Sequence, residues 1–386
     1  MHGPVSPGKW YAFSVTSRNT IATLIILLMV VFGLAHRVIS DVKHDFDRLK
    51  AAIFTTSVTV LPRTEPMRNP HASPLPEILT SSSNTQAVNA TEEPIRLLFV
   101  GDIMPSRYVA VKMARNTRAY PFRDTSFLTR KADLAFANLE SPVTSGRAIA
   151  NSEMIFRTDP EVIPELARAG FDVVSLANNH TPNWGESGLR DTVRILASSS
   201  IAYAGVGTRS DAYVPIYMYA RGLRIAIIAQ NDSDVVPADY CAGGSRIGTA
   251  CFDIAALASS TRAARSHADF VVFTMHAGVE YATTSSARQR AFARDAIDAG
   301  ADVVIGHHPH VIQNEEVYKG KPIFYSLGNF IFDQDLSPAT QRGLVVILQV
   351  SPRTKTITAI ERYRVRIEDY ARPVITSSST TPFPGK

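Results

Sequence analysis

The chain of 386 residues and 42.2 kDa is long enough to hold a sizeable core, and its 45% hydrophobic and 19% charged content is ordinary for a globular protein. The formal net charge is +5, yet lysine and arginine form no block and no RNA-binding motif occurs. A nucleic-acid partner is therefore not expected, whereas a weak preference for anionic substrates or surfaces is compatible with this charge.

An apolar segment follows a polar leader of residues 1–20. Residues 21–39 approach the roughly 20 residues that span a bilayer, whereas the core Ile21–Ala35 also fits the apolar part of a cleavable signal peptide. A buried soluble helix is disfavoured, because the following sequence offers nothing local to pack against. The long leader favours an uncleaved signal anchor, so we expect a single-pass protein of the cell membrane. The signal-like character and the cysteine pair described below predict that its domain faces outside the cytoplasm.

Proline, serine and threonine dominate two further parts of the chain. Residues 40–94 have the composition of a disordered tether, apart from Val42–Phe54, which could form a short amphipathic helix. Residues 372–386 have the same character and are expected to form a disordered tail. One folded domain, residues 95–371, is expected between them.

Short apolar runs and helical patterns alternate within this domain. The predicted strands are Ile95–Val100, Leu134–Ala137, Asp172–Leu176, Ile225–Ala229, Phe270–Thr274, Val303–Ile305, Ile323–Tyr325 and Leu344–Val350. The predicted helices are Val109–Arg115, Val162–Ala169, Gly188–Ser198, Ile254–Arg265 and Arg288–Ala299. This alternation predicts α/β layers with helices outside the sheets, and the strand-rich stretch Leu344–Ile367 makes a mixed sheet the expected one.

Polar residues follow the ends of six predicted strands. They are Asp102, Asn138 and Glu140, Asn178 to His180, His276, His307 to His310, and Asn329. Strand ends are where α/β sheets present chemistry, and carboxylates, imidazoles and an amide oxygen together suit Zn, Mn or Fe. A lone His276 is more typical of a core histidine and a lone Asn179 of a helix cap, but their joint occurrence favours a metal site.

These motifs resemble those of the calcineurin-like metallophosphoesterases, and more closely their CapA branch of capsule-synthesis or poly-γ-glutamate biosynthesis proteins. The segments that carry the resemblance, in the family's order, are residues 99–104, 137–140, 176–180, 276–281, 306–310 and 325–330. The resemblance implies an αββα sandwich of two mixed sheets flanked by helices, with one or two divalent metals at the strand ends.

The resemblance also implies roles for individual residues. Asp102 and His310 would bind a first metal, and Glu140 stands near the bridging position. The ligands of a second metal would be Asn179, His276 and His308. His180 would be a catalytic, non-ligand histidine that stabilises the phosphoryl group or protonates the leaving oxygen. A water activated by two metals would attack a phosphoester in line.

Three positions depart from the wider pattern. Met104 stands where the superfamily has a histidine, and a thioether is a poor ligand for hard metals. Asn138-Leu139-Glu140 replaces a Gly-Asp pair, and the CapA branch shares both departures. Ala277 stands where that branch often carries tryptophan, which would widen or reshape the pocket.

Two substrate-binding residues and a cysteine pair complete the predicted sites. Arg157 could clamp an anionic substrate or be a surface arginine before a helix cap, and Asn329 is the second candidate for substrate contact. Cys241 and Cys251 bracket a short Gly-rich loop. An even pair in an exported domain favours a disulfide, and two buried thiols are the alternative.

Two kinds of function are compatible with these features. One is a membrane-anchored, phosphoesterase-type hydrolase acting on an anionic envelope polymer or a phosphoester in capsule or poly-γ-glutamate biosynthesis. The other is a non-catalytic metal-containing scaffold of an envelope polymer synthesis or export complex. Amide-bond hydrolysis at the same site is a third possibility. The expected partners are the membrane, the polymer or phosphoester, and polymer synthase subunits.

Overall fold

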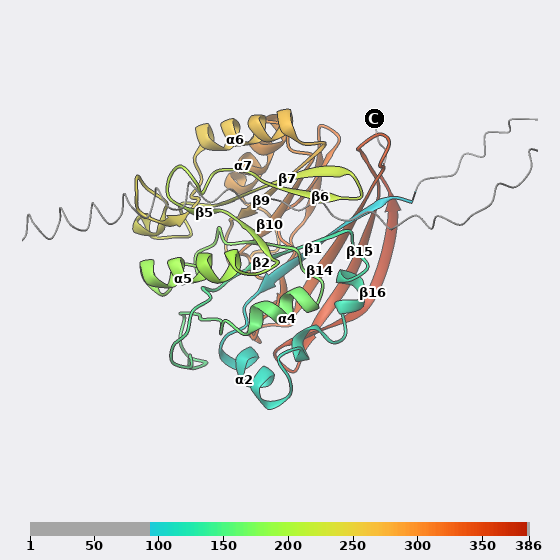
Figure 1. Ribbon diagram of the computed structural model, residues 1–386. Coiled ribbons are helices and arrows are strands. Elements are labelled where there is room, and N and C mark those ends of the chain that lie inside the picture. Colours follow the sequence, from blue (N-terminus) through green and yellow to red (C-terminus); the bar gives the residue numbers. More distant parts are fainter. Residues whose placement is uncertain (1–92, 384–386) are drawn as a thin grey trace, which may run out of the picture. The chain divides into compact units, whose positions relative to one another are not determined.

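The computed structural model describes residues 93–383, and in this part of the chain two β-sheets pack face to face with helices outside them (Figure 1). Both sheets contain parallel and antiparallel pairs. The predicted α/β architecture, two mixed sheets flanked by helices, is confirmed.

The first sheet contains both ends of the described chain. Its strands, in spatial order, are β16 (Arg372–Pro382), β15 (Ile357–Glu368), β14 (Arg342–Val350), β1 (Ile95–Ile103), β2 (Leu134–Leu139), β3 (Val173–Ser175) and β4 (Ala202–Ala204), with β13 (Asn329–Ile331) paired to the end of β1. β1 to β4 are parallel, whereas β14 to β16 are antiparallel. The helices of this half of the domain are α2 (Arg107–Arg115), α3 (Ser126–Thr129), α4 (Val162–Arg168) and α5 (Gly185–Ala197).

The second sheet is built from the middle of the chain. Its strands, in spatial order, are β11 (Glu315–Tyr318), β12 (Lys321–Phe324), β10 (Val303–His307), β9 (Phe270–His276), β7 (Leu223–Asn231) and β6 (Ile216–Ala220). β7, β9, β10 and β12 run parallel, and α6 (Ile254–His267) and α7 (Ala287–Asp298) cover its outer face. A small pair, β5 (Val206–Gly207) and β8 (Gly248–Thr249), lies apart.

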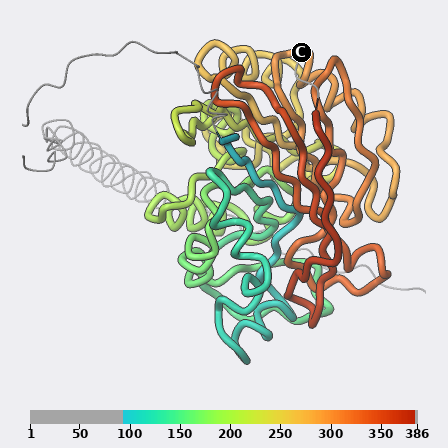
Figure 2. The backbone as a smooth tube through the Cα atoms, turned by 90° about the vertical axis from the view of Figure 1, so that its right-hand side faces the viewer, coloured from blue at the N-terminus to red at the C-terminus, as the bar shows by residue number. Residues whose placement is uncertain are grey.

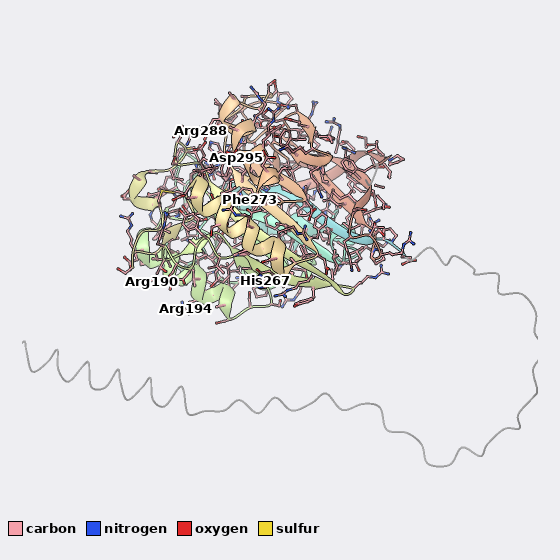
Figure 3. The ribbon with its side chains drawn as sticks, turned by 90° about the horizontal axis from the view of Figure 1, so that it is seen from above. Arg190, Arg194, His267, Phe273, Arg288 and Asp295 are labelled. Carbon is pink, nitrogen blue, oxygen red and sulfur yellow. A yellow bond between two sulfur atoms is a disulfide. The ribbon has the colours of Figure 1, made fainter. Side chains whose placement is uncertain are left out.

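Side-chain alternation explains why the central strands are almost continuously apolar. In β1, Leu97 and Phe99 face the core between the sheets, whereas Leu98 and Val100 face the core under the outer helices. A strand buried on both faces needs apolar residues at every position. The helices are one-sided instead: α5 buries Leu189, while Arg190 and Arg194 point away from the core (Figure 3).

Local signals start the two helices of the second sheet. The Asp253 carboxylate accepts hydrogen bonds from the backbone N–H groups of residues 255 and 256 at the start of α6. Ser286 and Gln289 form a capping box at the start of α7. Both arrangements satisfy N–H groups that have no partner within the helix.

The cysteine pair lies in the loop after β7. Cys241 and Cys251 form a disulfide, which is the pairing that the sequence favours. The hydroxyl of Tyr213 donates a hydrogen bond to the backbone oxygen of Cys251, so the cross-link is tied to the segment before β6. Two free thiols, the alternative considered above, do not occur at these positions.

The prediction of a disordered tail is wrong for residues 372–382. This segment is β16, which pairs with β15 from Arg372 opposite Glu368 to Pro382 opposite Ala359. The last strands, red in Figure 2, run side by side along the first sheet. β16 is an edge strand and is mostly exposed, so it needs few apolar side chains. Its backbone is held by pairing with β15, which serine and threonine side chains do not prevent.

The predicted localisation is corrected by the structure. Among residues 93–383, no helix is long and apolar enough to cross a membrane. The segment on which that prediction depended, residues 21–39, lies outside the described residues, as do the leader, the possible helix Val42–Phe54 and the tether up to residue 92.

Candidate metal centre

The carboxyl ends of the parallel strands bring the predicted site residues together. Asp102 in β1 is paired with Asn138 in β2 and with Asn329 in β13. In the second sheet, His276 at the end of β9 is paired with His307 at the end of β10. Because strands of both sheets end at the same place, residues that are more than two hundred positions apart in sequence, such as Asp102 and Asn329, become neighbours.

Two glycines allow this close assembly. A Cβ atom on Gly101 would lie 1.9 Å from the backbone oxygen of Gly328, and one on Gly306 would lie 2.0 Å from that of Tyr325. Any side chain at either position would therefore push neighbouring strands apart. Each glycine directly precedes a site residue, Asp102 or His307, so a larger residue there would displace the site as well as the sheet.

The three residues predicted to bind a second metal converge on one point. Nε2 of His276 lies 2.8 Å from Oδ1 of Asn179 and 3.1 Å from Nδ1 of His308. Oε1 of Glu140 lies 3.8 Å from the same nitrogen. Atoms that bind one metal at about 2.1 Å are roughly 3.0–3.4 Å apart in octahedral or tetrahedral geometry, so these donors have close to the spacing of a coordination shell.

The other predicted ligands lie beside this cluster. Nδ1 of His310 lies 3.4 Å from Oδ2 of Asp102, and Nε2 of His310 lies 3.7 Å from Oε1 of Glu140. Among residues 93–383, these two carboxylate oxygens are buried and have no hydrogen-bond partner. Leaving such atoms unsatisfied is costly, and a divalent cation would satisfy both. The residues present therefore fit a metal.

The loop that carries two of the histidines is strained. His308 has a φ angle of 98° and His310 one of 58°, in the region that residues other than glycine rarely adopt. Backbone strain of this kind persists when the surrounding structure enforces it, and it is concentrated at functional sites. Here one short loop turns the imidazole of His310 toward Asp102 and Glu140 and that of His308 toward His276.

Amide side chains hold the ligands in place. Nδ2 of Asn138 donates to Oδ1 of Asp102 at 2.8 Å, and Oδ1 of Asn138 accepts from Nδ2 of Asn178 at 3.1 Å. Oδ1 of Asn329 lies 2.9 Å from Nδ1 of His310, while its Nδ2 donates to the backbone oxygen of Thr340. Nδ1 of His310 is thereby the donor, which leaves its Nε2 free for a metal.

Burial favours the neutral form of His276 and His308, two of the histidines in the cluster. Burial, and then the neighbouring His308, lowers the pKa of His276 well below its usual range. Burial, and then the charge of His310, lowers the pKa of His308 to about 3. Burial, together with the Asp102 carboxylate, raises the pKa of Glu140. Burial alone would raise the pKa of Asp102 too, but contacts with His307 and His310 hold it well below its usual value. Neutral imidazoles are the form that binds metals.

His180 lies at the edge of the cluster. Its Nε2 is 4.0 Å from Oε1 of Glu140, and its ring packs on Phe156 with centroids 3.9 Å apart. Burial lowers the pKa of His180 to about 4, against the hydrogen bond to Asn183, which raises it. Its position beside the donors, without joining them, is compatible with the predicted non-ligand role.

The two predicted substrate-binding residues are both tied up in internal contacts. The side chain of Arg157 is only 6% exposed, so it is not a surface arginine. Its Nε donates to the backbone oxygen of Arg147, and its Nη1 donates to that of Thr144 and to Asp159. Asn329 is fully buried beneath His310. Substrate contact by either residue stays a prediction.

One charged residue near the site was not predicted from the sequence. Arg107 is 7% exposed, pairs with Asp333, and lies with its guanidinium carbon 4.7 Å from the centre of the Phe156 ring. Its charge acts on the pKa values of Glu140 and His180. The sequence did hold a hint of this position, because Arg107 follows Asp102 in the same strand-to-helix turn. Its ion-pair partner could not be predicted, since Asp333 lies 226 residues further along the chain.

The position that departs from the superfamily pattern lies in an apolar environment. Met104 is fully buried and packs in a small apolar cluster with Phe156, Phe332 and Ile367. It offers nothing to a metal beside Asp102. Ala277, the other small departure, is buried in the core under α7, so it does not line an open pocket.

Fold and site together define an αββα sandwich with a candidate divalent-metal centre at the strand ends. The family described as bacterial capsule synthesis protein PGA_cap matches residues 96–334, more than half of the chain, so the chain belongs to this family. The predicted membership of the CapA group is thereby confirmed.

Individual relatives agree with this assignment. The capsule biosynthesis protein CapA of Bacillus anthracis is 34% identical over 262 residues, which cover 66% of this chain and 63% of that protein. The PGA biosynthesis protein CapA of Bacillus subtilis (strain 168) is 35% identical over 259 residues, covering 66% and 68%. The chain thus spans less than two thirds of the length of the B. anthracis relative.

Among solved structures, the calcineurin-like phosphoesterase YfkN from Bacillus subtilis is 13% identical, with a TM-score of 0.44. That match covers 75% of this chain and 90% of the other.

Proposed function

We propose that the chain is a divalent-metal hydrolase of the phosphoesterase type that serves biosynthesis of a capsule or poly-γ-glutamate polymer. One observation carries the proposal: three donor atoms from three other strand ends lie within 3.8 Å of Nε2 of His276. One of them, Oε1 of Glu140, and the nearby Oδ2 of Asp102 are buried carboxylate oxygens without hydrogen-bond partners among residues 93–383. Such a mixed oxygen and nitrogen set suits Mn, Fe or Zn.

The residues would divide the work. Asn179, His276, His308 and Glu140 would hold one metal, and Asp102 with His310 would hold a second. Bound metals would act as Lewis acids and activate a water for in-line attack. His180 would transfer a proton to or from a group bound next to Oε1 of Glu140, because its Nε2 lies 4.0 Å from that atom. The buried guanidinium of Arg107 would make the site more favourable for an anionic substrate.

A non-catalytic metal-containing scaffold is the second candidate. The observation that favours it is that the matching relatives are named for capsule and PGA biosynthesis, not for hydrolysis. In that case the same ligands would stabilise the domain through bound metal, without turnover.

The test is a variant at His180, measured for metal content and for turnover of an aryl phosphodiester and of poly-γ-glutamate. His180→Ala should keep its metal and thermal stability but lose roughly 10²–10⁴-fold in turnover. His267→Ala, a change at an exposed histidine at the end of α6, is the matched control and should leave both unchanged. Metal-loaded protein that turns over neither substrate would favour the scaffold.

A further inference from the structure

The hydrogen bonds around Asn183 decide which ring nitrogen of His180 carries the proton. Oδ1 of Asn183 lies 2.8 Å from the backbone nitrogen of Phe156 and 2.8 Å from Nδ1 of His180. Asn183 is half-buried and lies one turn beyond His180, where its own N–H donates to the His180 backbone oxygen.

The Phe156 contact fixes the orientation of the amide. A backbone N–H can only donate, so the atom facing it must be the carbonyl oxygen Oδ1. Turning the amide over would place its NH₂ group against another donor. The orientation of the Asn183 amide is therefore set by the hydrogen-bond network.

The orientation of the amide then fixes the proton on His180. An amide oxygen only accepts, so Nδ1 of His180, 2.8 Å away, must be the donor. A flipped imidazole would place a ring carbon at that distance, which is shorter than C–H···O contacts of about 3.3–3.6 Å. In the neutral ring, a proton on Nδ1 leaves Nε2 with a lone pair.

Two further contacts hold this residue, and Nε2 of its ring faces the metal centre. The backbone N–H of His180 donates to Oδ1 of Asn178 at 3.1 Å. Its ring packs against Phe156. Nε2 is the nitrogen that lies 4.0 Å from Oε1 of Glu140, too far for a direct hydrogen bond but near enough for a small molecule to lie against both.

We propose that Asn183 is a positioning residue that holds His180 as the Nδ1–H tautomer, so that Nε2 accepts a proton from the attacking water and does not begin as the donor to the leaving group. The role in turnover rests on the proposed hydrolase function, whereas the tautomer does not. It also differs from the role that the family resemblance implies for His180.

The proton balance of the step is simple. Nε2 takes one proton from the water as the water oxygen bonds to phosphorus, and the bond from phosphorus to the leaving oxygen breaks. The imidazolium releases its proton to bulk water, and the leaving oxygen takes one from bulk water. The net reaction consumes one water. A neutral amide at Asn183 orients the ring without adding a charge next to it.

The test measures the tautomer directly, with ¹⁵N-histidine NMR on the zinc-loaded full chain and with His180→Ala to identify the signals. The wild-type protein should show a protonated Nδ1 and a bare Nε2 at His180. Asn183→Leu, which removes the acceptor, should move at least half of the ring population to the Nε2–H form. Asn183→Asp keeps an acceptor for both donors and should retain the Nδ1–H tautomer.

Turnover gives the second readout. Asn183→Leu should lower kcat about 10–100-fold with little change in KM, and Asn183→Asp should recover most of it, at unchanged metal content. A protonated Nε2 in the wild type, or an unchanged tautomer in Asn183→Leu, would overturn the proposal. If no variant turns over any substrate, the hydrolase function fails, and the NMR result still decides the tautomer.

Discussion

The two halves of the metal centre differ in how completely the protein builds them. Around Nε2 of His276, an amide oxygen and a second imidazole lie within 3.1 Å, and all three come from different strand ends. Around Oδ2 of Asp102, the nearest predicted ligand nitrogen is that of His310 at 3.4 Å, and it already donates to Asn329. The neighbouring position, Met104, faces an apolar cluster.

In the His276 half, the donor atoms already have a spacing that suits one metal. The Asp102 half offers only a carboxylate and one histidine as predicted ligands. We therefore expect the His276 half to bind metal more tightly than the Asp102 half. Glu140 joins them, because its Oε1 lies within 3.8 Å of both His276 and His310 nitrogens.

The largest effect is expected from His276→Ala. It removes the nitrogen on which the tight half converges, so most of the bound metal should be lost. With metal in thousandfold excess over its Kd, the loss of linkage would cost about 4 kcal/mol of stability. Metal analysis and thermal melts with and without chelator measure both quantities.

His310→Ala is the matched comparison in the other half and should lose less metal and less stability. A variant pair in which both proteins keep all their metal would contradict the site assignment. Equal losses in the two would contradict the proposed inequality between the halves.

A smaller effect is expected from Met104→His, which restores the histidine of the wider superfamily. The side chain at this position is fully buried among Phe156, Phe332 and Ile367, so a polar ring there lacks partners. We expect a loss of about 3 kcal/mol in unfolding free energy, without a gain in metal content. A rise in metal stoichiometry, measured by elemental analysis, would show that position 104 can reach the metal.

The smallest effect concerns pH in the metal-free protein. The pKa of His308 is lowered to about 3 by burial and by the charge of His310. Its unfolded value is about 6.5, so between these values the unfolded chain binds more protons and stability falls as pH falls. From pH 7 to pH 5 this histidine should cost on the order of 2 kcal/mol.

Chemical denaturation of chelated protein at both pH values measures that loss. His308→Asn should flatten the dependence, since it removes the titrating ring, and an equal slope in this variant would exclude His308 as the source.

The sequence predicts the strands well where they are buried on both faces, as in Ile95–Val100. A short, continuous apolar run is typical of such a strand. It misses β16, since Ser377, Ser378 and Ser379 carry no apolar pattern and are held by pairing with β15. That pairing is a tertiary contact, which composition does not report.

In the candidate site too, some features follow from the sequence pattern and others depend on tertiary contacts. The proximity of the candidate ligands could be expected, because imidazoles and carboxylates at strand ends form a rare pattern. The residues that orient them were not. Asn183 acts through the backbone of Phe156, 27 residues earlier, and Arg107 through Asp333, 226 residues later. Asparagine and arginine are common enough that only their contacts reveal a role.

The pairing of β1 with β14 bears on how the protein is made. Ile95, in the first described strand, lies opposite Val350 in the sheet, so the strand that carries Asp102 gains this neighbour only when most of the chain has been synthesised. Contacts of such high sequence separation slow folding. A nascent chain that has already produced His276 and His310 still lacks a finished first sheet, so the metal centre would be assembled after translation, as a late folding event.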